Sequence, residues 1–83
     1  MPLMKKDEMR TKQISDLPLA AYLSLTGHRI VQIKSLERKS IFLFEESETL
    51  EKDLLSYFNR TSSVEPLAFA EMLRNLKALV LQG

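Results

Sequence analysis

The sequence predicts an α+β fold, a single small domain in which one helix is followed by a β-hairpin and then by two further helices (αββαα). Three observations lead to this prediction. Between His28 and Glu45 apolar residues alternate with polar ones, as they do in strands. On either side of this stretch the apolar residues recur at helical spacing instead. With 83 residues, of which 45% are hydrophobic, the chain is long enough for one core but too short for two.

Residues 1–14 are predicted to be a flexible N-terminal arm, and residues 15–83 to form the domain. The arm mixes methionine with basic and acidic residues and shows little periodicity, which is typical of a segment without a fixed place in a core. It lacks the apolar segment of a signal peptide, and no part of the chain approaches the roughly 18 apolar residues of a membrane helix. We therefore expect a cytoplasmic protein that makes no membrane contact.

The first helix is predicted over residues 17–26. Ser15 or Asp16 can cap its N-terminus, and Pro18 suits its first turn because the missing N–H costs nothing there. Gly27 can adopt the left-handed conformation that ends a helix. Apolar side chains surround most of this helix, so it should be covered on more than one side, either by the core or by a partner.

The hairpin follows, with a predicted two-residue turn at residues 37–38. This turn would place Ile33 opposite Phe42 and Val31 opposite Phe44, all on the face of the hairpin that forms the floor of the core. A slip of one residue would turn the opposite face towards the core instead. Because an isolated hairpin is only marginally stable in water, the helices should exist mainly to cover this floor.

The second helix is predicted over residues 48–58, with Ser47 as its N-cap and Asn59 in the left-handed conformation at its end. A short connection leads to Pro66, which suits the first position of a third helix that ends near residue 81. The predicted core consists of the apolar residues that these patterns turn inward: Val31, Ile33, Phe42, Phe44, Leu54, Phe58, Phe69, Leu73 and Leu76.

Four stretches carry much of this pattern: the opening SDLPLAAYLSLTGH, the hairpin end FLFE, the helix end LSYFN and the late segment VEPLAFAEMLRNLKAL. Together they resemble a family of short uncharacterised α+β domains from bacteria and phages. The resemblance covers about residues 15–79, and most of the matching residues serve packing and capping. It therefore implies an architecture, without an activity or catalytic residues, and an origin in a phage or other mobile element.

Residues suited to catalysis are scarce. The chain has one histidine and no cysteine, which leaves no cysteine nucleophile and no thiolate metal site. His28 follows the expected helix stop, where a protonated imidazole interacts favourably with the helix C-terminus, so we expect it to be structural. The acids of residues 45–53 lack the spacing of a calcium loop, and two glycines are too few for a phosphate-binding loop. We expect no enzyme, and no catalytic, cofactor-binding or metal-binding residues.

Two sets of hairpin residues are candidates for binding. The basic residues Arg29, Lys34, Arg38 and Lys39 could contact the phosphates of a nucleic acid or an acidic partner. The apolar residues Ile30, Ile41 and Leu43 are expected on the strand face away from the core, where they would support self-association.

The function predicted from these sets is that of a small non-enzymatic protein-interaction or regulatory module, binding a protein partner or forming a homodimer. The alternative is a nucleic-acid-binding accessory protein that uses the basic hairpin. A net charge of only +1 and the acidic start of the second helix disfavour this alternative, because both reduce attraction to a phosphate backbone.

Overall fold

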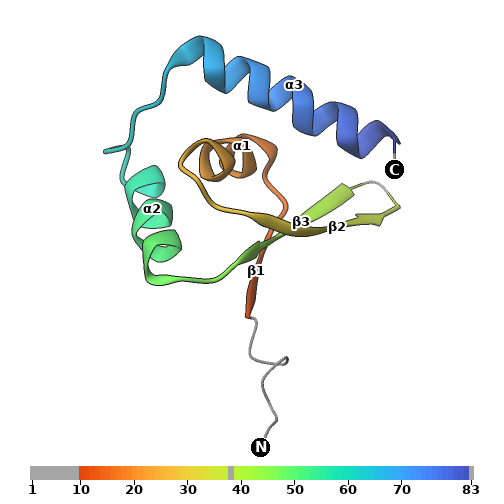
Figure 1. Cartoon of the computed structure of the whole chain (residues 1–83), viewed down its shortest axis with the longest axis horizontal. Helices are drawn as coiled ribbons and strands as arrows, with labels where there is room; N and C mark the ends of the chain where they lie inside the picture. The colour runs from red at the N-terminus through yellow and green to blue at the C-terminus, as the bar shows by residue number, and fades with distance from the viewer. Residues whose placement is uncertain (1–9, 38, 83) are drawn as a thin grey trace, which may run out of the picture.

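The computed structural model describes residues 10–37 and 39–82, and in it three helices lie on one side of an antiparallel three-stranded sheet (Figure 1). The strand order in the sheet is β1-β3-β2. In chain order the elements are β1 (Thr11–Ile14), α1 (Leu17–Leu25), β2 (Ile30–Leu36), β3 (Lys39–Glu45), α2 (Glu48–Phe58) and α3 (Pro66–Gln82). The predicted α+β fold is confirmed, and the five predicted elements follow one another in the predicted order.

The strand β1 corrects the predicted boundary of the N-terminal arm. Residues 11–14 pair with β3, with Lys12 opposite Phe44 and Ile14 opposite Phe42. Ile14 is buried in the core, and Lys12 forms an ion pair with Glu51 of α2 at 3.4 Å. Only one large apolar side chain marks this strand in the sequence, and so alternation could not reveal it. The rest of the predicted arm, residues 1–9, lies outside the described residues.

The hairpin has the predicted turn, since Leu36 pairs with Lys39 and Ile33 with Phe42. The predicted pairing of Val31 with Phe44 is wrong. A register shift at Val31 places Ile30 opposite Phe44. Such a β-bulge inserts one extra residue, and therefore every position before it changes face. Ile30 consequently packs against the core, and Val31 does not.

The centre of the core is α1, which lies between the sheet and α3, with α2 at one end (Figure 1). The carboxylate of Asp16 caps it by accepting a hydrogen bond from the Leu19 N–H at 3.0 Å, and Gly27 follows it with φ 103°. The side chains of Leu19, Ala20, Ala21, Tyr22 and Leu23 are all buried. The core thus covers this helix on several sides, as its uniformly apolar sequence predicted.

The caps of α2 and α3 differ from the prediction at one residue. Ser47 Oγ accepts a hydrogen bond from the Leu50 N–H at 3.0 Å, as expected for an N-cap. Asn59 was predicted to be left-handed, but its φ is −86°, and Arg60 has the positive φ of 61°. At the start of α3 the Glu65 carboxylate accepts hydrogen bonds from two backbone N–H groups, which makes Glu65 the cap before Pro66.

Most of the predicted core is confirmed. Phe42, Phe44, Leu54 and Leu76 are buried, while Ile33, Phe69 and Leu73 are partly buried and pack against them. Val31 is excluded by the bulge. Phe58 is wrong as well, because α3 packs on α1 and leaves the Phe58 side chain 66% exposed at the end of α2.

Candidate functional site

The predicted basic residues do not form one patch. Lys34 lies opposite Ile41 on the face of the sheet that points away from the helices. Lys39 lies beside the hairpin turn and lines a cleft below α3, and Arg29 lines a separate hollow before β2. The fourth candidate, Arg38, lies outside the described residues. The three described residues are all exposed.

The three residues predicted for self-association are also divided. Ile30 is turned into the core by the bulge, which corrects its predicted place on the outward face. Leu43 stays outside the main core cluster but is only 6% exposed. Ile41 is partly exposed, and Leu36, two residues beyond Lys34, is 48% exposed.

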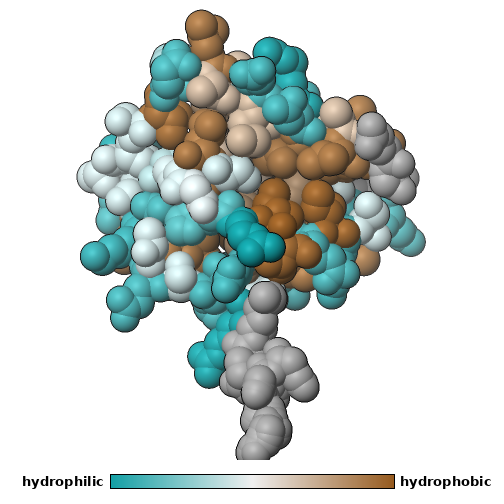
Figure 2. Space-filling view, viewed as in Figure 1, coloured by the Kyte–Doolittle hydropathy of each residue, from teal (hydrophilic) through white to brown (hydrophobic). Residues whose placement is uncertain are grey.

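We call the helix-free side of the sheet the outer face. The residues of β2 and β3 that define it alternate with the core-facing ones or, in one case, form the bulge: Val31, Gln32, Lys34, Leu36, Lys39, Ile41, Leu43 and Glu45. Figure 2 shows hydrophobic side chains gathered where β2 and β3 cross the view, and again where α3 begins. No element of the described chain lies over the outer face (Figure 1). The sequence patterns did not identify Val31 or Leu36 as outer-face residues. For Val31 the reason is the bulge, which the alternation of apolar and polar residues does not indicate.

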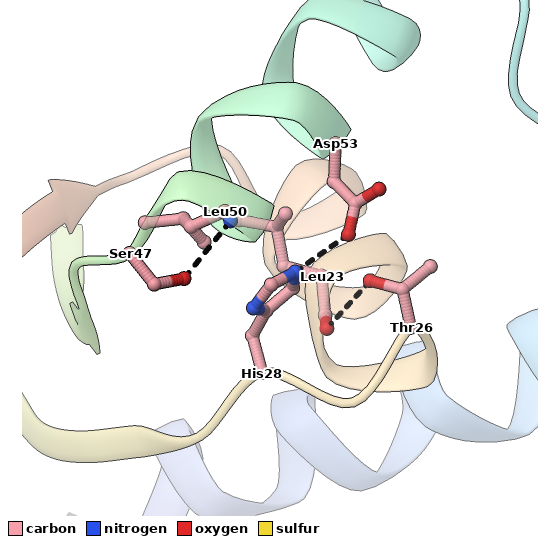
Figure 3. Close-up of polar contacts among 6 residues, drawn as sticks. All are labelled: Leu23, Thr26, His28, Ser47, Leu50 and Asp53. Atoms are coloured by element: carbon pink, nitrogen blue, oxygen red, sulfur yellow. Dashed lines mark hydrogen bonds and ion pairs between the residues drawn. The ribbon is translucent and has the colours of Figure 1, made fainter.

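A histidine–aspartate pair joins the α1–β2 connection to α2. His28 Nε2 lies 2.6 Å from Asp53 Oδ2, and the side chains are 9% and 23% exposed (Figure 3). The backbone N–H of His28 also donates a hydrogen bond to the Leu23 carbonyl at 3.0 Å. This bond is part of the C-terminal cap of α1, together with the left-handed Gly27. His28 therefore contacts both the end of α1, through its backbone N–H, and α2, through its side chain.

Two hydroxyl groups near this pair are occupied by the backbone. Thr26 Oγ1 donates to the Leu23 carbonyl, and Ser47 Oγ accepts from the Leu50 N–H (Figure 3). A nucleophilic hydroxyl needs a hydrogen bond to a base, and here the hydroxyls bond to helix ends instead. The pair consequently resembles a structural clamp more than a catalytic site.

We expect the His28–Asp53 pair to stabilise the fold. Replacing either residue by alanine should lower the free energy of unfolding by about 1–3 kcal/mol, because the remaining partner is left partly buried without its hydrogen bond. Urea unfolding of both single variants and the double variant measures this coupling. If the effects of the two single changes simply add, then the pair does not act as a unit.

The cleft below α3 has a volume of about 630 Å³. It opens between the hairpin turn and the last turns of α3, and Lys39, Phe42 and Lys77 are among the residues that line it. The hollow around His28 and Arg29 is smaller, at about 390 Å³, and it is lined mostly by polar residues.

Other chemical groups are few in the described chain. The rings of Tyr22 and Tyr57 pack with their centroids 5.4 Å apart. Burial, with a smaller effect of the Asp16 carboxylate, raises the pKa of Tyr57 above its ordinary value. Residues 10–37 and 39–82 contain no group of three potential metal-ligating side chains and no helix long and apolar enough to cross a membrane.

Comparison with known proteins gives one match. A family model described as "Domain of unknown function (DUF5659)" matches residues 9–82. It extends beyond the resemblance over residues 15–79 and includes β1. Neither the curated proteins nor the solved structures contain a match to this chain.

Proposed function

The chain belongs to the DUF5659 family of domains of unknown function, and from its geometry we propose that it is a small non-enzymatic binding module that associates with a second copy of itself through the outer face. The observation that carries this proposal is the one-sided arrangement of the helices, which leaves the other side of the sheet without a covering element among the described residues (Figure 1). A sheet that is apolar on both sides normally buries both.

The composition of the outer face supports this proposal. Val31 and Ile41 are partly exposed apolar residues on neighbouring strands, and Leu36 extends this apolar area towards the turn. Leu43, on the same face, is only 6% exposed. Charged residues occupy the ends of the apolar area. Protein interfaces commonly have this arrangement of an apolar centre within a polar rim.

The charges also favour an isologous contact. Lys34 lies opposite Ile41 near the turn, whereas Glu45 lies four residues further along β3 on the same face. A two-fold axis near Leu43 would therefore bring Lys34 of one copy close to Glu45 of the other. Two such pairs would form per dimer, one on each side of the axis.

Of the two expected ways to cover the first helix, the core and a partner, this proposal needs only the core, because the core buries the side chains of α1. The regulatory role, the origin in a phage or other mobile element and the cytoplasmic location are also proposals. They are supported only by the sequence patterns described above.

We expect a dimer at micromolar concentrations, measured by sedimentation equilibrium. Ile41→Glu should give a folded monomer, because a carboxylate at the centre of the contact would be buried without a partner. Lys34→Glu should weaken the dimer, and Glu45→Lys added to it should restore association. Leu55→Glu is the matched control, since Leu55 is an exposed apolar residue on α2, 62% exposed.

The N-terminal segment is tested in the same experiment. Deletion must stop at residue 9, because residues 11–14 form β1. A monomer mass at high concentration, for both the full chain and the shortened chain, would contradict the proposal. So would association that Ile41→Glu and Leu55→Glu weaken equally.

Nucleic-acid binding by Arg29, Lys34, Arg38 and Lys39 stays the alternative prediction. The separation of the described basic residues gives it less support than a continuous patch would. Tight binding of a duplex or a single strand that weakens steeply with salt would favour it over the dimer.

A further inference from the structure

The cleft below α3 has a structural cause in the sheet. Along the core side of the hairpin, the pairs Ile30–Phe44 and Ile33–Phe42 carry large side chains, but the next pair, Ser35–Ser40, carries small ones. At this end α3 continues past α1 (Figure 1), and of α1 only its first residue, Leu17, lines the space. The cleft of about 630 Å³ lies between these serines and the last turns of α3.

The walls of the cleft are largely apolar. Phe42 forms part of its floor and is only 1% exposed, while Val80 and Leu81 of α3 line the opposite wall. Leu81 is 86% exposed at the end of α3, so that its side chain is accessible to a molecule bound in the cleft. These walls suit an apolar chain and not a fully polar ligand.

The rim of the cleft carries a cation on the side of α3, Lys77. Lys39 of β3 also borders the cleft, but it pairs with Leu36, so that its side chain starts from the outer face of the sheet. The ion pairs between described residues involve Lys12 and His28, and neither rim lysine takes part in them. One acid, Glu37, also lines the cleft, at the hairpin turn.

Hydroxyl groups complete the set of anion-binding groups. Ser35 and Ser40 both line the cleft, and no hydrogen bond from either side chain to another described residue is found. Hydroxyl and ammonium groups are the donors that a carboxylate accepts from, and charge-assisted bonds of this kind are stronger than neutral ones.

We propose that this cleft binds a small carboxylic acid with an aliphatic chain. The carboxylate lies beside Lys77 and accepts hydrogen bonds from the serine hydroxyls, and the chain lies against Phe42, Val80 and Leu81. The volume falls within the range of roughly 300–1,000 Å³ that small-molecule sites have. The cleft is on the helix side of the sheet, so this inference is independent of the proposed dimer.

Decanoate is a suitable probe, with amide chemical shifts of the full-length protein as the readout. We expect saturable shifts confined to residues around the cleft, and much weaker binding of decanol, which has the same chain without the charge. Lys77→Glu should weaken decanoate binding about tenfold or more, the loss expected for one charge-assisted hydrogen bond.

Matched variants separate the cleft from general charge and hydrophobicity. Lys52→Glu makes the same charge change on the exposed surface of α2 and should leave decanoate affinity unchanged. Leu81→Ser should weaken binding, whereas Leu67→Ser, at the other end of α3 and 77% exposed, should not. Equal binding of decanol, equal loss in Lys52→Glu, or shifts that do not saturate would each overturn the proposal.

Discussion

Replacing Phe44 by alanine is expected to lower the free energy of unfolding by about 3–5 kcal/mol. Phe44 lies on the central strand of the sheet, its side chain is 0% exposed, and it pairs with Lys12 on one side and Ile30 on the other. The substitution leaves a cavity that the neighbouring side chains cannot fill without moving. Urea unfolding followed by circular dichroism measures the loss.

Phe58→Ala is the matched control for this substitution. It removes the same atoms from a side chain that is 66% exposed, and should change stability by only about 0.5 kcal/mol or less. Sequence periodicity predicted that both phenylalanines lie in the core, whereas the structure buries only Phe44. The two variants therefore distinguish between the predicted and the observed burial. Equal losses of unfolding free energy for the two variants would contradict the burial of Phe44 and the exposure of Phe58.

A second large effect is expected for Leu23→Ala, about 2–5 kcal/mol. Leu23 is 0% exposed on α1, the helix that lies between the sheet and α3. Its carbonyl accepts hydrogen bonds from Thr26 Oγ1 and the His28 N–H, and alanine retains both. The loss would therefore report side-chain packing and not the helix stop.

Leu55→Ala tests this interpretation. Leu55 is also a helical leucine, but it is 62% exposed on α2. We expect its replacement to change the free energy of unfolding by about 0.5 kcal/mol or less. A Leu23 variant as stable as the Leu55 variant would contradict the central position of α1.

The hairpin shows which strand pairings could be predicted from the sequence and which could not. Alternation and the two-residue turn identified the pairing of Ile33 with Phe42, because both signals depend on local spacing. The bulge at Val31 depends instead on how the strand twists over the core, and no residue type in the sequence predicts it. One extra residue was enough to exchange Ile30 and Val31 between the core and the outer face.

The remaining differences arise from tertiary packing. Phe58 continues the apolar stripe of α2, but α3 packs on α1 and does not cover the Phe58 side chain. The strand β1 has one large apolar residue, Ile14, and depends on pairing with β3 for its existence. Local sequence patterns cannot predict such contacts between distant parts of the chain.

The candidate sites were predictable to a similar degree. The sequence placed Ile41 and Leu43 on the strand face away from the core, and the pairing of β2 with β3 agrees. It gave no sign of the His28–Asp53 pair, which joins residues 25 positions apart. The cleft could have been suspected from the serines that end the core face of the hairpin, but only the position of α3 makes it a cleft.

The central claim, self-association through the outer face, is tested most directly by methyl NMR signals recorded over a range of protein concentrations. We predict that the signals of Ile41 and Val31 shift as the protein is concentrated into the micromolar range. Those of Leu55 and Leu67, which are exposed apolar residues on the helices, should stay in place. Concentration-dependent shifts at Leu55 or Leu67 with Ile41 and Val31 unchanged would contradict the claim, as would the absence of any shift.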